Sequence, residues 1–194
     1  SPGKYFYNMD PLVNPWKVLD EKIVYENPWI RVKDYQIINP SGNPGVYGKV
    51  HFKHRAVVVL PLDDQQHTWL VGQYRFVLDQ YSWELPEGGA PLEEDPLLAA
   101  QRELREETGL VASQWQLLQK LHVSNSVSDE EAYLYLAQGL KQFSAEPEET
   151  EKLVIQRLPF EEVFRKVESG DITDSLTIAT VYKVKLLLRD GQKL

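Results

Sequence analysis

Residues 88–110, GGAPLEEDPLLAAQRELREETGL, constrain the fold of this chain more than any other segment. Asp95 followed by Pro96 is typical of a helix start, because a carboxylate caps free N–H groups and proline lacks an N–H that would go unpaired there. Gly109 is placed as a helix-ending glycine. The segment therefore predicts a helix over 96–108, preceded by a glycine-containing loop.

The predicted helix has an apolar stripe and a neighbouring acidic face. The stripe should pack on the core and consists of Leu97, Ala100, Leu104 and Thr108. Glu103, Glu106 and Glu107 are spaced three and four apart, so they project together from the acidic face. A solvated face is the ordinary interpretation of such a run. The capped helix and the glycine loop favour instead a site for Mg²⁺ or Mn²⁺, which bind carboxylate and water oxygens.

The spacing of this segment resembles the signature of the Nudix hydrolases: glycine, five residues, glutamate, seven residues, then Arg-Glu-apolar-x-Glu-Glu-x-Gly-apolar. The residues that carry the resemblance are Gly88, Glu94, Arg102, Glu103, Leu104, Glu106, Glu107, Gly109 and Leu110. It implies a hydrolase that cleaves a diphosphate with Mg²⁺, for which Mn²⁺ can substitute.

The resemblance also implies a metal site. Glu103 and Glu107 would be the principal ligands, and Glu106 would add a ligand or order a water. The main-chain carbonyl of Glu87 would be a further ligand. Alanine is usual at that position, so the Glu87 side chain departs from the family pattern.

Other residues of the segment are expected to shape the site. Arg102 would orient Glu106 or Glu107 through a charge-assisted bond. Glu94 would brace the loop before the helix. Gly88 and Gly89 would let the backbone turn sharply and approach the substrate closely.

Outside this segment the chain resembles the branch that cleaves ADP-ribose and nucleoside diphosphate sugars. The likeness lies in GQYRFVLDQYSWELPEGG, in the ending LPFEEVFRKVESGDITDSLTIATVYKVKLL, and in a strand-rich extension, 1–52, ahead of the catalytic domain, 53–194. In that branch the extension pairs two subunits and lines the nucleotide site. The resemblance therefore implies a homodimer.

The resemblance places the general base in an acidic loop, where the candidates are Glu148, Glu149 and Glu151. Glu130 and Glu131, just before a predicted strand, are a second possibility. A solvated loop is the alternative for each of these acids.

Two further residues match substrate-contacting positions. Arg75 would contact a phosphate or the terminal sugar, with a surface ion pair as the alternative. Trp29 would stack on the base, which does not identify the base because stacking tolerates all of them. Residues 124–130, SNSVSDE, depart from the Ser-Pro-Gly often found there, so the sugar stays open.

Composition agrees with an enzyme of small anionic molecules. The 194 residues suffice for one sizeable core. The net charge of −8, with 29 acids against 21 bases, disfavours long nucleic acids as partners. No apolar run approaches the roughly 20 residues that span a membrane. The absence of cysteine, and a start that resembles neither a signal nor a transit peptide, lead us to expect a cytoplasmic protein.

Apolar periodicity outlines the remaining elements. Strands are predicted at 17–25, 30–38, 45–54, 56–62, 68–75, 115–122, 131–137 and 154–158. Helices are predicted from 160 to 167 and from a cap at Asp174 or Ser175 to near Gly191. Strands flanked by helices suggest an α/β (α+β) fold in which a mixed sheet lies between helical layers. The Nudix resemblance implies the same α/β/α sandwich, with the small N-terminal β extension added.

The most favoured function is Mg²⁺-dependent hydrolysis of the diphosphate bond of ADP-ribose or a related nucleoside diphosphate sugar, which yields a nucleoside monophosphate and a sugar phosphate. The alternatives are another nucleoside diphosphate derivative (a dinucleoside polyphosphate, a coenzyme or a nucleoside triphosphate) and a non-catalytic ligand-binding module. The complete set of signature acids counts against the non-catalytic module.

Overall fold

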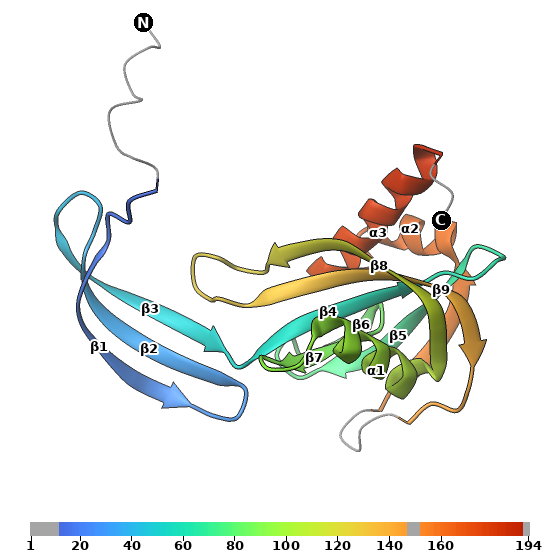
Figure 1. Ribbon diagram of the computed structural model, residues 1–194, viewed down its shortest axis with the longest axis horizontal. Coiled ribbons are helices and arrows are strands. Elements are labelled where there is room, and N and C mark those ends of the chain that lie inside the picture. Colours follow the sequence, from blue (N-terminus) through green and yellow to red (C-terminus); the bar gives the residue numbers. More distant parts are fainter. Residues whose placement is uncertain (1–11, 147–151, 192–194) are drawn as a thin grey trace, which may run out of the picture. The chain divides into compact units, whose positions relative to one another are not determined.

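A computed structural model describes residues 12–146 and 152–191, and the chain divides into two units, residues 1–52 and 53–194. The first unit is an antiparallel sheet of three strands, β1 (Lys17–Glu26), β2 (Ile30–Ile38) and β3 (Pro44–Phe52) (Figure 1). These strands were predicted to within two residues at each end.

The strands of the first unit bury little apolar surface. Among its described residues, Ile37 alone is buried. Large apolar side chains remain exposed, including Val18, Leu19, Ile23, Val46 and Trp29. Turn residues and backbone pairing therefore order this sheet more than a core of its own.

The second unit contains two sheets and three helices in the described residues (Figure 1). Its elements are β4 (His54–Pro61), β5 (His67–Arg75), β6 (Gln80–Glu84), β7 (Glu87–Pro91), α1 (Pro96–Thr108), β8 (Leu110–His122), β9 (Glu131–Gln142), β10 (Val154–Pro159), α2 (Phe160–Glu168) and α3 (Ser175–Arg189). One sheet has the order β7-β4-β9-β8 and the other β10-β5-β6. Because β4 runs parallel to β9 and antiparallel to β7, the larger sheet is mixed.

Strand β4 shows why helices cover both faces of the larger sheet. Successive side chains of a strand point to opposite faces. Val57 and Val59 pack in one apolar cluster with residues of α1, whereas Val58 and Leu60 pack in another with residues of α2 and α3. All four are fully buried. The predicted α/β/α arrangement with a mixed sheet is confirmed.

The predicted elements differ from the observed ones mainly around the site. Strands β6 and β7 were not predicted, because each is only five residues long and β7 carries Gly and Pro rather than an apolar alternation. β8 begins at Leu110 rather than at residue 115, and β9 continues to Gln142 rather than ending at 137. Cross-strand pairing carries both strands beyond their apolar residues. None of the helices in the described residues has the length and apolarity needed to cross a membrane.

Candidate active site

Helix α1 begins and ends where the sequence predicts. Asp95 accepts a hydrogen bond from the Leu97 amide at 2.8 Å, Pro96 occupies the first turn, and Gly109 closes the helix with a left-handed φ of 75°. Its apolar stripe packs on the core as predicted, with Ala100 and Leu104 fully buried. These caps fix where each glutamate of the helix points.

Three acids of α1, Glu103, Glu106 and Glu107, are called the helix carboxylates here, and they lie near the first residues of β7. Glu103 and Glu107 are buried, with 9% and 2% of their surfaces exposed, so they do not form a solvated face. The Glu87 amide donates to Glu107 Oε2 at 3.2 Å. At Gly88, a Cβ atom would overlap the carboxyl group of Glu103. The backbone at residues 87–88 is therefore packed directly against two of the three acids.

Arg102 gathers the acids of this segment around one guanidinium group. Its nitrogens donate to Glu103 Oε1 at 2.9 Å, to Glu94 Oε2 at 3.1 Å and to Glu106 Oε2 at 3.5 Å. A further bond reaches the Gly89 carbonyl at 3.2 Å. Partial burial lowers the pKa of Arg102, but the hydrogen bond to Glu94 and the charge of Glu103 outweigh it, so the pKa is raised above its ordinary value.

These residues fit a hard divalent cation. Glu103 and Glu107 are one helical turn apart, and both side chains are buried, so that little water reaches them. Carboxylate oxygens are ligands that such cations prefer. The Glu103 carboxyl group can lie this close to the backbone because residue 88 has no side chain. Buried anions of this kind require compensation, which Arg102 supplies in part and a divalent cation would complete.

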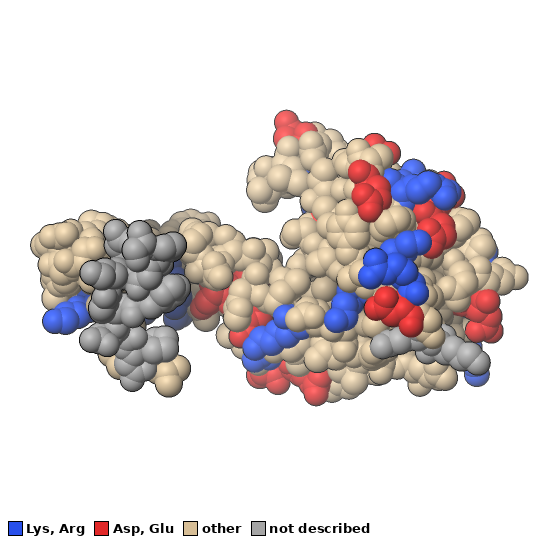
Figure 2. All heavy atoms as spheres, turned by 90° about the horizontal axis from the view of Figure 1, so that it is seen from above, with Lys and Arg blue, Asp and Glu red and all other residues tan. Residues whose placement is uncertain are grey.

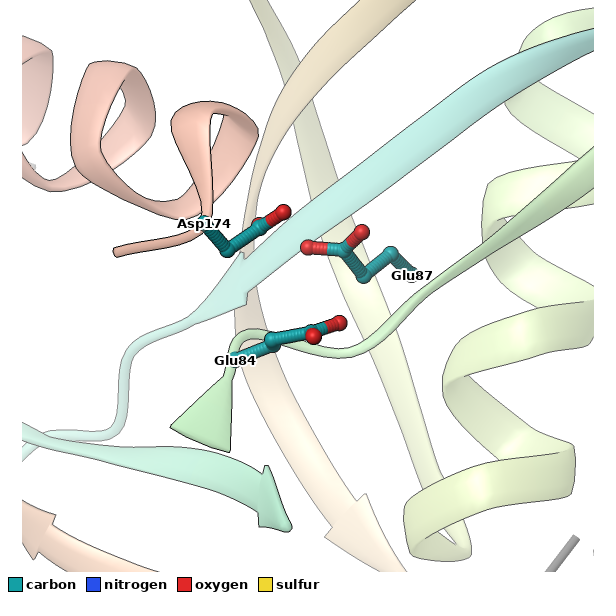
Figure 3. Close-up of side chains that lie close together, drawn as sticks. All are labelled: Glu84, Glu87 and Asp174. Carbon is teal, nitrogen blue, oxygen red and sulfur yellow. The ribbon is translucent and has the colours of Figure 1, made fainter. Parts of the chain in front are cut away.

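A second group of acids was not predicted as part of the site. The cavity carboxylates Glu84, Glu87 and Asp174 come from β6, from β7 and from the residue before α3, and Figure 3 shows them pointing toward one another. Their oxygens all lie within 4.8 Å of one another. In the described residues the helix carboxylates form no group this compact.

Hydrogen bonds and an ion pair hold the cavity carboxylates. Asp174 caps α3 and accepts from the Thr177 amide and hydroxyl at 3.0 and 2.7 Å. The Thr177 hydroxyl also lies 3.3 Å from Glu87 Oε1. Arg75 donates from Nε and Nη2 to the two carboxyl oxygens of Glu84, whose side chain is only 4% exposed.

Glu87 and Asp174 titrate differently. Burial raises the pKa of the Glu87 carboxyl well above its ordinary value, and the hydrogen bond with Asp174 raises it further. Burial also acts to raise the pKa of Asp174, but its bonds with Glu87 and Thr177 outweigh this and lower it. The contact between the two carboxyl groups therefore raises the pKa of Glu87 and lowers that of Asp174.

The cavity carboxylates line a cavity of about 520 Å³, which is within the size range of small-molecule sites. Arg75 and Glu130 lie on its wall, and the turn after β5 contributes Phe76, Val77 and Leu78. Burial raises the pKa of the Glu130 carboxyl. Through Glu87 the cavity adjoins the backbone that contacts the helix carboxylates.

The structure brings some of the predicted site residues together and leaves others apart. Arg75 lies in the cavity and is bonded to Glu84, while Glu131 pairs instead with Lys120 at 3.3 Å and Arg55 at 3.6 Å. Trp29 belongs to the first unit and is 65% exposed. The base candidates Glu148, Glu149 and Glu151 lie outside the described residues.

Sequence reasoning missed Glu84 and the cavity role of Asp174. Asp174 was predicted only as a possible helix cap, and this is confirmed. No local spacing connects residues 84, 87 and 174, because tertiary packing joins them. The unusual Glu87 side chain was the one available signal.

Charged residues are mixed on the outer surface. On the face that Figure 2 shows, acidic and basic side chains of residues 53–194 lie among one another rather than in separate fields. A long polyanion needs an extended basic surface. The described residues on the face shown form no extended basic surface of that kind.

Comparison with known proteins identifies the family. Residues 52–176 match the NUDIX domain, and residues 16–50 match the nucleoside diphosphate sugar hydrolase N-terminal domain. The chain belongs to the Nudix family and is a Nudix hydrolase. Nudix hydrolases generally use divalent metals.

Individual relatives narrow the class. The ADP-ribose pyrophosphatase of Mycobacterium tuberculosis (strain ATCC 25618 / H37Rv) is 40% identical over 154 residues, which cover 77% of this chain and 73% of that protein. The methanol dehydrogenase activator of Bacillus methanolicus is 33% identical over 133 residues, with 68% and 72% covered. A crystal structure of an ADP compounds hydrolase superposes with a TM-score of 0.82 at 24% identity and covers 93% of this chain and 98% of that one, which shows a shared fold.

Proposed function

We propose that this Nudix hydrolase cleaves the diphosphate bond of ADP-ribose or a related nucleoside diphosphate sugar, depends on Mg²⁺, and releases a nucleoside monophosphate and a sugar phosphate. The observation that carries the proposal is the pair of buried carboxylates Glu103 and Glu107, set against the Glu87–Gly88 backbone. The similarity to an ADP-ribose pyrophosphatase over 77% of the chain supports this choice of substrate.

The protein's own residues would divide the work of the site. Glu103, Glu107, Glu106 and the Glu87 carbonyl would hold the metal, with Mn²⁺ as a possible substitute. A divalent cation bound there neutralises the diphosphate and lowers the pKa of a water. Arg102 would orient the carboxylates through its bonds to Glu103 and Glu106.

Hydrolysis adds one water across the P–O–P link. The water oxygen bonds to one phosphorus, the bridging oxygen leaves with the other phosphate, and a base accepts the water proton. We assign the base to one of Glu148, Glu149 and Glu151. Glu130 is the second candidate, because it lines the cavity, and there its raised pKa favours proton acceptance.

Activity of the Glu107→Gln variant tests the proposal. Purified protein is incubated with ADP-ribose, GDP-mannose and UDP-glucose in Mg²⁺, and products are identified chromatographically. We expect wild-type protein to form AMP and ribose 5-phosphate from ADP-ribose, and the variant to lose at least about 10²-fold in turnover while its circular dichroism is retained. Equal activity in variant and wild type would refute the assignment.

The first unit is proposed to pair two copies of the chain and to line the nucleotide site. Its exposed apolar residues, Trp29 among them, support this because a sheet with one buried residue lacks a core. Light scattering should give the mass of a homodimer. Trp29→Ala should raise KM by about tenfold, as loss of a base stack worth about 1–3 kcal/mol would do. A monomer with an unchanged KM would refute both roles.

Another nucleoside diphosphate derivative is the second candidate substrate. It is supported by the similarity to the ADP compounds hydrolase NudE of Escherichia coli (strain K12), which is 25% identical over 173 residues and whose name covers ADP compounds in general. A non-catalytic module is disfavoured by the buried acids at 103 and 107. The absence of cysteine supports a cytoplasmic location.

A further inference from the structure

The cavity beside Glu87 has two chemically different walls, and Figure 3 shows the three carboxylates of one of them. One wall carries the cavity carboxylates Glu84, Glu87 and Asp174. The other wall includes the turn after β5, where Phe76, Val77 and Leu78 are 95%, 90% and 57% exposed. Exposed apolar side chains next to buried or half-buried carboxyl groups form the mixed lining that small-molecule sites use to fix both the position and the orientation of a ligand.

The charge of the lining limits what the cavity accepts. Among the described lining residues Arg75 is the one cation, and its Nε and Nη2 atoms are bonded to Glu84. Glu87, Asp174 and Glu130 add further carboxyl groups. A ligand group that carries an additional phosphate would bring its negative charge close to these acids, which is unfavourable.

Sugar rings match both walls. A pyranose or furanose presents hydroxyl donors at its edge and C–H groups on its face. Carboxyl oxygens accept from hydroxyls, and an aromatic ring such as Phe76 packs against an apolar face. Two carboxyl groups as close as those of Glu87 and Asp174 suit a pair of neighbouring hydroxyls.

We propose that this cavity holds the sugar half of the substrate, that Glu87 and Asp174 accept hydrogen bonds from its vicinal hydroxyls, and that the cavity discriminates against groups with a further phosphate. The inference rests on the proposed function and assigns specificity to two side chains. Glu87 joins the two groups of acids, because its side chain lines the cavity and its main-chain amide contacts Glu107.

Matched substrates separate the possible ligand chemistries. Initial rates are measured for ADP-ribose, ADP-glucose and ATP. They are also measured for CDP-glucose and CDP-choline, because choline places a quaternary ammonium without neighbouring hydroxyls where CDP-glucose has its sugar. For the wild type we expect kcat/KM for ADP-ribose to exceed that for ATP by about 100-fold or more, and CDP-glucose to exceed CDP-choline. Preference for CDP-choline or ATP would overturn the inference.

Variants then test the two side chains. Glu87→Ala and Asp174→Asn should each lower kcat/KM for ADP-ribose by about tenfold, mainly through a higher KM. The ratio of kcat/KM for ADP-ribose to kcat/KM for ATP should therefore fall. Asparagine preserves the helix cap at 174, and Glu87→Gln serves if the alanine variant does not fold. Glu168→Gln, an exposed acid on α2, is the charge-matched control and should match the wild type.

The results distinguish the two levels of the proposal. Unaltered substrate ratios in folded Glu87 and Asp174 variants of an active enzyme would overturn the sugar assignment and leave the proposed function intact. A wild type that cleaves none of these diphosphates would refute both.

Discussion

The helix carboxylates and the cavity carboxylates lie on two sides of the Glu87–Gly88 backbone and are stabilised differently. Glu103 and Glu106 bond to one arginine, and Glu107 bonds to a backbone amide. The cavity group is held by a threonine, by contacts between its own acids, and by an arginine that bonds only to Glu84 among them.

This difference separates two chemical roles. The helix carboxylates are held by a guanidinium group and a backbone amide, an arrangement that can present oxygens to a metal, whereas Glu87 and Asp174 contact each other directly, which suits that pair to hydrogen bonding. Compactness alone is therefore a poor guide to metal binding here, because the acids of the tighter group contact one another and the pKa of Glu87 is raised well above its ordinary value.

The largest expected effect concerns a third set of acids, outside both groups. We predict that one of Glu148→Gln, Glu149→Gln and Glu151→Gln lowers kcat by about 10²–10⁴-fold with little change in KM, as loss of a general base does. Steady-state kinetics on all three variants checks this. Glu130→Gln, on the cavity wall, should cost less than tenfold. A larger loss in Glu130→Gln would move the base into the cavity.

A smaller but still large effect is expected at the glycines between the two groups. Gly88→Ala should lower activity by about 10²-fold, because its Cβ would displace the Glu103 carboxyl. Gly89→Ala is the matched control, since the nearest atom to its Cβ is His54 Cβ at 3.6 Å, an ordinary contact. Kinetics and thermal melts of both variants measure the difference. Equal losses of activity in the two variants would show that activity does not depend on the close contact between residue 88 and the Glu103 carboxyl group.

The smallest effect is expected at an ion pair away from the site. Asp63 is half of an ion pair with Arg157 and accepts from the Gln65 and His67 amides at 2.9 Å. Burial acts to raise its pKa, but the bonds from His67 and Arg157 prevail, so the pKa is lowered. A lowered folded pKa gives stability that is present above the model-peptide value of 3.8 and is lost as pH falls through the folded pKa.

Asp63→Asn should therefore lower the midpoint of thermal unfolding at pH 7 by about 2–4 °C, for a loss of about 1 kcal/mol. The difference from wild type should shrink below pH ~4, where the unfolded-state carboxyl is protonated. Activity should not change. A difference that grows in acid would contradict the assigned sign.

The sequence sufficed for one carboxylate group and not for the other. Helix caps and three- and four-residue spacings are local, so Asp95, Gly109, Glu103 and Glu107 could be placed before the fold was known. Glu84, Glu87 and Asp174 meet only because β6 and β7 pack beside the start of α3, and nothing in a local pattern encodes that contact. The short strands β6 and β7 were missed for the same reason, since their pairing partners, β5 and β4, supply their order.

Binding of Mn²⁺, measured by electron paramagnetic resonance in the absence of substrate, tests the central claim most directly. The wild type and Asp174→Asn should bind Mn²⁺ with affinities within about twofold of each other, and Glu107→Gln should bind at least about tenfold more weakly. Weakened binding in Asp174→Asn with undiminished binding in Glu107→Gln would place the metal among the cavity carboxylates and contradict the account.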